Sequence, residues 1–246
     1  MTDLVPAPDT SEKAPVVFTA AGLRAGVRRC LPVALGVFTY GLVFGVLARQ
    51  AGLSVAESLL MSGIVYAGAS QFAALGLWAT PLPVIAIVLT TLVINLRHVM
   101  MSASLYPWLG RLRAPALYGL LFFLTDESWA VSVAEFRTGR RDVGFFAGAG
   151  LLVFVAWLAA TAAGYLIGEV VTDPASLGLD FALTAVFTAL LVGLWRGRRD
   201  LLPWGVAAVV AIVGSRLLPG NWYILLGGLA GSVVGALRAG EAGDAG

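Results

Sequence analysis

The sequence predicts an all-α polytopic membrane protein, built as a bundle of transmembrane helices. Of its 246 residues, 59% are hydrophobic and only 12% are charged, which is about half the charged fraction of ordinary soluble domains. Apolar stretches long enough to cross a bilayer as helices recur along most of the chain. These stretches are continuous and do not alternate apolar with polar residues, which argues against a transmembrane β-barrel.

The apolar stretches predict about eight helical segments in one transmembrane domain over residues 23–238. We expect flexible polar tails at residues 1–22 and 239–246, the first of them cytoplasmic. Most of the prolines fall near segment ends or in connections, where proline costs least. The expected segments are 31–49, 57–79, 83–107, 115–136, 143–168, 178–196, 201–218 and 222–238.

The distribution of basic residues predicts that both termini are cytoplasmic, because Lys and Arg accumulate on that side. In this arrangement eleven basic residues lie inside, four lie outside and Arg97 lies within the membrane. Segments two and three fit least well, since Arg111 and Arg113 are placed outside. A re-entrant segment in place of a crossing would lower the number of crossings to seven or fewer.

Segment two contains a run of small and polar residues, from Tyr66 to Phe72, within its apolar stretch. This run is a candidate point for the helix to break, and a half-helix starting there would present backbone N–H groups to a carboxylate. The alternative is a continuous helix whose small residues form a packing face. Gly68, Ser70 and Gln71 are therefore candidate substrate-binding residues.

Segment three carries Asn95, Arg97 and His98, the single histidine of the chain. Ionisable groups at bilayer depth usually mark a substrate or proton path. Arg97 is suited to a bidentate pair with a carboxylate of a substrate or of Asp126; the alternative is an internal ion pair that fixes segment three to segment four. Histidine side chains in general titrate near neutral pH, so His98 is a candidate for proton transfer. The alternative is that it completes a hydrogen-bond network.

Segment four carries Thr125, Asp126 and Glu127 within an apolar stretch. Neighbouring positions of a regular helix point about 100° apart, so the two carboxylates should not face one cavity. We expect one to pair with Arg97 and the other to bind an ammonium group or a proton. The candidate substrate-binding residues here are Asn95, Arg97, Asp126 and Glu127, and the candidate proton-coupling residues are His98, Asp126 and Glu127.

Other chemistries find little support in the residues. Cys30 is the single cysteine, so no intramolecular disulfide is expected, and no Cys/His cluster indicates a metal site. We expect no cofactor and, without basic patches, no nucleic-acid partner. An intramembrane enzyme that uses Ser70 or Ser102 with His98 is a minor alternative, because one serine and one histidine do not make a catalytic triad.

Four pieces of the sequence together resemble the AzlC family of branched-chain amino acid permeases. Their order and spacing match the family, and the combination is specific although each piece alone is weak. The pieces are GLVFG at Gly41–Gly45, MSGIVYAGASQF at Met61–Phe72, LVINLRHVMM at Leu92–Met101 and FLTDESWA at Phe123–Ala130.

The resemblance implies an exporter of valine, leucine and isoleucine in the bacterial inner membrane, driven by the proton-motive force and working with a small AzlD-type membrane subunit. The residues suit such a substrate: Asp126 or Glu127 for its ammonium group, and Arg97 or the backbone near Gly68–Gln71 for its carboxylate. One methylene in an apolar pocket is worth only about 1–3 kcal/mol, so methionine is a further candidate. The alternative function is a channel or importer for another small polar solute.

Overall fold

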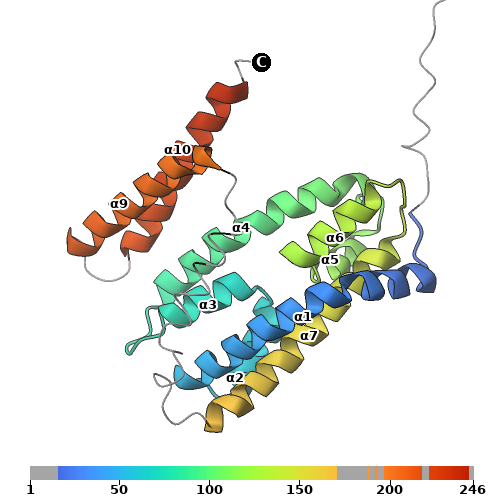
Figure 1. Cartoon of the computed structure of the whole chain (residues 1–246), viewed down its shortest axis with the longest axis horizontal. Coiled ribbons are helices and arrows are strands. Elements are labelled where there is room, and N and C mark those ends of the chain that lie inside the picture. Colours follow the sequence, from blue (N-terminus) through green and yellow to red (C-terminus); the bar gives the residue numbers. More distant parts are fainter. Residues whose placement is uncertain (1–15, 171–187, 189–191, 193–196, 218–221, 244–246) are drawn as a thin grey trace, which may run out of the picture. The chain divides into compact units, whose positions relative to one another are not determined.

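The structure is a computed structural model of the chain, and it describes residues 16–170, 188, 192, 197–217 and 222–243 (Figure 1). The described residues form helices and one isolated β-bridge, which confirms the all-α prediction. Within the described part of the chain, four helices are long and apolar enough to cross a membrane: Ala20–Gln50, Val84–Leu109, Val143–Glu169 and Arg198–Leu217. The expected segment at 178–196 lies almost entirely outside the described residues.

Segments two and four are the ones that differ most from the predicted plan, because each is divided into short helices. Segment one begins earlier than predicted, at Ala20, and segment eight extends to Gly243. The elements are α1 (Ala20–Gln50), α2 (Val55–Leu60), the π-helical turn η2 (Met61–Val65), α3 (Gly68–Gly76), α4 (Val84–Leu109), α5 (Ala114–Leu121), α6 (Asp126–Phe136), α7 (Val143–Val170), the 3-10 turn η5 (Arg198–Asp200), α9 (Leu201–Leu217) and α10 (Trp222–Gly243).

Contacts between residues divide the chain into two compact units. Unit 1 comprises Met1–Leu42 and Leu96–Ala162, and unit 2 comprises Val43–Asn95 and Ala163–Gly246. The long helices α1, α4 and α7 each contribute residues to both units. The predicted single transmembrane domain at 23–238 stays a prediction.

In unit 1, α1 and α7 pack closely and run in the same direction. A methyl group on Gly26 would lie 2.0 Å from the carbonyl oxygen of Phe145, and one on Gly41 would lie 2.7 Å from the methyl of Ala160. Positions rise together along both helices, so the two are parallel. Small residues allow helix backbones to approach this closely in membrane proteins.

Segment four was predicted as one helix over 115–136, and this was wrong. The chain breaks between α5 and α6, where Thr125 adopts an extended conformation. Its hydroxyl accepts the N–H of Ser128 at 3.2 Å, and the Ser128 hydroxyl accepts the N–H of Thr125 at 2.9 Å. This capping box satisfies donors that a new helix start leaves open. Hydropathy does not register such a cap inside an apolar stretch.

After the break, α6 runs alongside α4 in the same direction, and α5 and α6 both lie near the end of α4 (Figure 1). Because α5 starts just after α4 ends, the segment must turn back at the break. Three contacts fix the direction of α6: Arg97 with Asp126 at 2.7 Å, Ser104 with Trp129 at 2.8 Å, and Trp108 with Phe136, whose ring centroids are 5.6 Å apart.

The apolar core of unit 1 fills the space between these helices. It joins the C-terminal half of α4 to α6 and to the first turns of α7. Its buried members are Met101, Leu105, Leu109, Leu124, Val133, Phe136, Val143 and Phe146.

In unit 2, segment two is broken, which decides between the two alternatives from the sequence. Tyr66 takes a left-handed conformation with φ 44° and Ala67 is extended, and α3 then starts at Gly68. The Gln71 side chain donates its Nε2–H to Ser62 Oγ at 3.1 Å, and both residues are fully buried. Nine residues of straight helix would rise about 13 Å, so segment two folds back on itself.

The fold-back places α3 near the end of α1, within unit 2. The rings of Phe44 and Phe72 meet edge-on with centroids 5.7 Å apart. The connection after α1 is held by α7, because the Tyr165 hydroxyl donates to the carbonyl of Leu53 at 3.0 Å. In the same unit α9 and α10 form an antiparallel pair, in which a methyl on Gly231 would lie 2.8 Å from that of Ala207 (Figure 1).

Replacing Gly26 with alanine should destabilise the protein, because the added methyl would collide with a backbone carbonyl that cannot move alone. Overpacking of this kind costs about 1–3 kcal/mol. The matched control is Gly36→Ala on the same helix, where nothing lies within 4 Å of the new methyl. That change should be neutral or stabilising by up to about 1 kcal/mol, from helix propensity. Thermal unfolding in detergent measures both, and equal midpoints would contradict the close packing of α1 on α7.

Replacing Thr125 with valine should weaken the start of α6 while keeping the shape of the side chain. Loss of an N-cap hydroxyl costs about 0.5–2 kcal/mol. Thr39→Val is the control, because the Thr39 hydroxyl is exposed and donates only to the carbonyl of Leu35 in its own helix. It should change the unfolding free energy by less than about 0.5 kcal/mol. Hydrogen exchange of the Ser128 amide reports the cap directly, and unchanged protection in Thr125→Val would argue against it.

Candidate functional site

The ion pair between Arg97 and Asp126 is the centre of the candidate site in unit 1. Arg97 Nη1 lies 2.7 Å from Asp126 Oδ2, and the two side chains are 28% and 47% exposed. Arg97 Nε is buried and has no hydrogen-bond partner among the described residues. Asp126 is the first residue of α6, where a negative charge is favoured by the helix dipole. The pair is therefore partly accessible, and one N–H donor of Arg97 is not used by it.

Glu127 lies in the same first turn but makes no ion pair within the described part of the chain. Its carboxylate is within electrostatic range of Cys30 and Tyr40 of α1. The two carboxylates thus have different surroundings, as the angle between neighbouring helix positions predicts. The expected pairing of one carboxylate with Arg97 is present, and the ligand of the other stays a prediction.

Tyr40 is a residue of this cluster that the sequence analysis missed. It lies within electrostatic reach of both Arg97 and Glu127, and its ring centroid is 6.2 Å from that of Trp157. The available signal was its phenol within the mostly apolar stretch 30–48 of that helix. The sequence does not show that the phenol comes within electrostatic range of both charges, which the tertiary structure decides.

Two serines on α6 were also missed, and both are fully buried. Ser128 belongs to the capping box, and its hydroxyl donates to the carbonyl of Phe123 at 2.9 Å. Ser132 lies one turn further along, and its hydroxyl has no hydrogen-bond partner among the described residues. A polar stripe on α6 therefore continues beyond the charged residues.

The candidate residues of segment two lie in unit 2. Gly68 is the first residue of α3, whose N-cap Ala67 provides no side-chain hydrogen bond and whose first turn contains no acidic residue. The Ser70 hydroxyl donates to the carbonyl of Ala67 at 2.9 Å, and Gln71 is bound to Ser62. The polar side chains here therefore support the break, and the N-terminal N–H groups of α3 are the part suited to an anion.

Asn95 and His98 lie one turn apart on α4, and both are partly exposed. Asn95 belongs to unit 2 and His98 to unit 1. The hydroxyls of the two serines considered for catalysis, Ser70 and Ser102, each donate to a backbone carbonyl three residues earlier, at 2.9 Å. The proton-coupling role of His98 stays a prediction.

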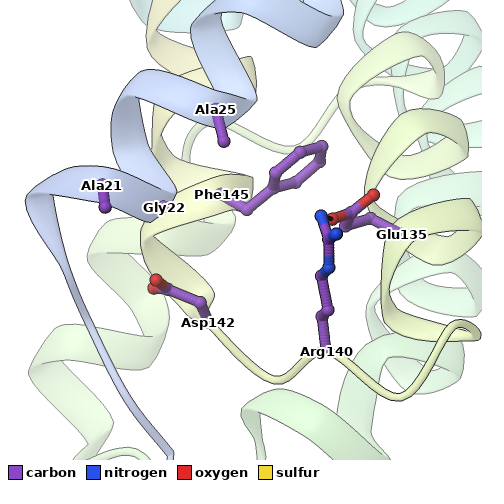
Figure 2. Close-up of a pocket in the computed structure, with 7 residues that line it drawn as sticks. All are labelled: Ala21, Gly22, Ala25, Glu135, Arg140, Asp142 and Phe145. Atoms are coloured by element: carbon purple, nitrogen blue, oxygen red, sulfur yellow. Dashed lines mark hydrogen bonds and ion pairs between the residues drawn. The ribbon is translucent and has the colours of Figure 1, made fainter.

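A cavity of about 240 Å³ lies elsewhere in unit 1, where α1 and α7 begin and α6 ends (Figure 2). Arg140 points toward Glu135 and forms an ion pair with it. Asp142 accepts the N–H groups of Thr19 at 3.1 Å and Gly144 at 2.9 Å, which joins the starts of α1 and α7. The charged side chains that line the cavity are thus already bound to other groups of the protein. The lining residues, none of them predicted as a site residue, are Ala21, Gly22, Ala25, Glu135, Arg140, Asp142 and Phe145.

Comparison with known proteins identifies relatives over most of the chain. A protein of Archaeoglobus fulgidus described as an uncharacterized membrane protein is 34% identical over 73% of this chain and 78% of its own length. The branched-chain amino acid transport protein AzlC of Bacillus subtilis is 25% identical over 83% and 80%. The inner membrane protein YgaZ of Escherichia coli is 29% identical over 89% and 90%. No solved structure matches the chain.

The family model described as AzlC protein matches residues 32–171, more than half of the chain. This range includes both helix breaks and the ion pair of Arg97 with Asp126. The family model and the relatives agree with the resemblance of the four sequence pieces, and the chain belongs to the AzlC family.

Proposed function

We propose that the protein is a secondary transporter that exports branched-chain amino acids across the bacterial inner membrane. Its substrates are valine, leucine and isoleucine, with methionine as a further candidate, and its energy source is the proton-motive force. A small AzlD-type membrane subunit is the proposed partner. Family membership and the name of the Bacillus subtilis relative support the substrate class. The observation that supports the site is the ion pair of Arg97 and Asp126 beside Glu127.

A zwitterionic amino acid needs one partner for each of its charges. Arg97 has a buried Nε–H without an acceptor among the described residues, which suits the substrate carboxylate. Glu127 has no ion-pair partner there, which suits the ammonium group. In this assignment Asp126 holds the guanidinium in position and does not touch the substrate amine. Without Asp126 the guanidinium would lose its ion-pair partner, so Asp126 is needed even when no substrate is bound.

The break in segment two offers a second group of binding residues. The N-terminus of α3 lacks both a side-chain cap and acidic residues, so its N–H groups remain suited to a carboxylate. Gly68 allows close approach to this backbone, while Ser70 and Gln71 hold its shape. Asn95 is proposed as a further hydrogen-bonding residue. His98, Asp126 and Glu127 are the candidates for proton coupling.

Leucine efflux from proteoliposomes tests the site. Arg97→Ala, Asp126→Asn and Glu127→Gln should each lower the saturable efflux rate at least about tenfold, since hydrogen bonds to charged groups are worth about 1.5–3 kcal/mol. Glu135→Gln is the matched control, because it neutralises a carboxylate on the same helix that is paired with Arg140. Its rate should stay near that of the unchanged protein. Reconstitution with and without the small subunit, across a panel of amino acids and pH gradients, tests partner and coupling.

The possible results separate the parts of the proposal. Unchanged efflux in all three site variants would reject the site but keep the transporter. Flux without saturation or counterflow would indicate a channel. Selective transport of another solute, with no leucine transport in either reconstitution, would reject the substrate class.

A further inference from the structure

We infer that segments two and four are re-entrant hairpins, each entering and leaving the membrane at one face, so that neither of them crosses the bilayer. Among the described residues the crossings are then α1, α4, α7 and α9, together with the expected crossing at 222–238 that α10 covers, while the expected segment at 178–196 lies largely outside those residues. The inference concerns the path of the chain and does not depend on the transported molecule.

The short helices cannot cross a membrane singly. α3, α5 and α6 contain 9, 8 and 11 residues, which correspond to lengths of about 12–16 Å at 1.5 Å per residue. The hydrocarbon core of a bilayer is about 30 Å thick. Two short helices in line would together be long enough to cross. The direction of the second helix in each segment, onward or back, therefore decides whether the segment crosses the membrane.

In segment four the second helix returns to the end from which the first one starts. α5 starts at Ala114, close to the end of α4 at Leu109. A crossing segment would carry Phe136 to the level of the start of α4, but Phe136 stacks on Trp108. The tip of the segment at Asp126 reaches Arg97, which is about 18 Å back along α4.

Segment two shows the same reversal by separate contacts within unit 2. A straight helix from Val55 would carry residue 72 about 25 Å away from the end of α1. Phe72 instead contacts Phe44, which lies in the penultimate turn of α1. The hydrogen bond between Ser62 and Gln71, which lie on opposite sides of the break, closes the hairpin.

Two re-entrant segments reverse the direction of α4 and leave the other crossings unchanged. The connection at 110–113 then lies inside and the connection at 77–83 lies outside. The first connection contains Arg111 and Arg113, and the second contains no charged residue. Thirteen basic residues then lie inside and only Arg49 and Arg216 lie outside. The positive-inside rule therefore favours the re-entrant arrangement over the original plan, using information independent of the contacts.

The arrangement also gives the chain an internal repeat. A long helix, a short helix, a break and a second short helix occur in that order in Ala20–Gly76 and again in Val84–Phe136. The third residue of the second short helix is a fully buried serine in both, Ser70 and Ser128. Because the long helix of the second copy runs in the opposite direction through the membrane, the two copies are inverted, as in many transporter folds.

Cysteine labelling tests the sidedness, because the chain has a single buried cysteine that Cys30→Ala removes. Single cysteines are then placed by Ala79→Cys, within the connection 77–83, and by Ala114→Cys, next to the connection 110–113. Both positions are exposed. A membrane-impermeant maleimide should label Ala79→Cys from the outside of intact cells and Ala114→Cys only in inside-out vesicles. Eight crossings give the opposite result at both positions.

Two further positions serve as controls, since both arrangements place them on the same side. Ala51→Cys should be labelled from outside and Thr138→Cys from inside. Leu82→Cys and Leu112→Cys repeat the readout in each connection if a first position reacts poorly. Labelling after solubilisation shows that each variant is present. Reaction of Ala79→Cys from inside, or of Ala114→Cys from outside, overturns the inference.

Discussion

Every backbone N–H and C=O group at membrane depth must find a partner within the protein, and the structure depends on how two helix breaks meet this requirement. At the start of α6, Thr125 and Ser128 bind each other's N–H groups. At the start of α3, the Ser70 hydroxyl binds the Ala67 carbonyl, while the donors of the first turn have no side-chain cap. One break is thus closed by the side chains of its own residues, whereas the N-cap residue of the other provides no side-chain cap.

The same contrast governs the electrostatics of the two half-helices. The first turn of α6 contains Asp126 and Glu127, which complement its dipole, whereas the first turn of α3 contains no acidic residue. Arg97 compensates one of the two carboxylates on α6. The charge that remains at this break is negative and suits a cation, and the partial charge at the other break is positive and suits an anion.

The glycine contacts of unit 1 explain how a residue from α1 comes to join this charged cluster. Gly26 lets the backbone of α1 lie directly against that of α7, and Gly41 makes room for the side chains of Ala160 and Trp157. Tyr40, next to Gly41, then lies within reach of the charges of Arg97 and Glu127. Polar contacts between several helices need this kind of fixed spacing, because a displacement of about 1 Å is enough to lose a hydrogen bond.

The sequence by itself determined the class of the protein, the positions of its long helices and the residues that carry charge at depth. Composition and hydropathy report the transfer of each stretch into lipid, and Arg97 and Asp126 stand out because that transfer is costly. Tertiary structure alone decided that Arg97 meets Asp126, that Tyr40 joins them, and that segments two and four turn back. The physical reason is that a reversal rests on contacts such as Ser62 with Gln71 and Trp108 with Phe136. Hydropathy along the chain is the same whether a segment crosses or returns, so hydropathy does not distinguish the two paths, whereas these contacts do.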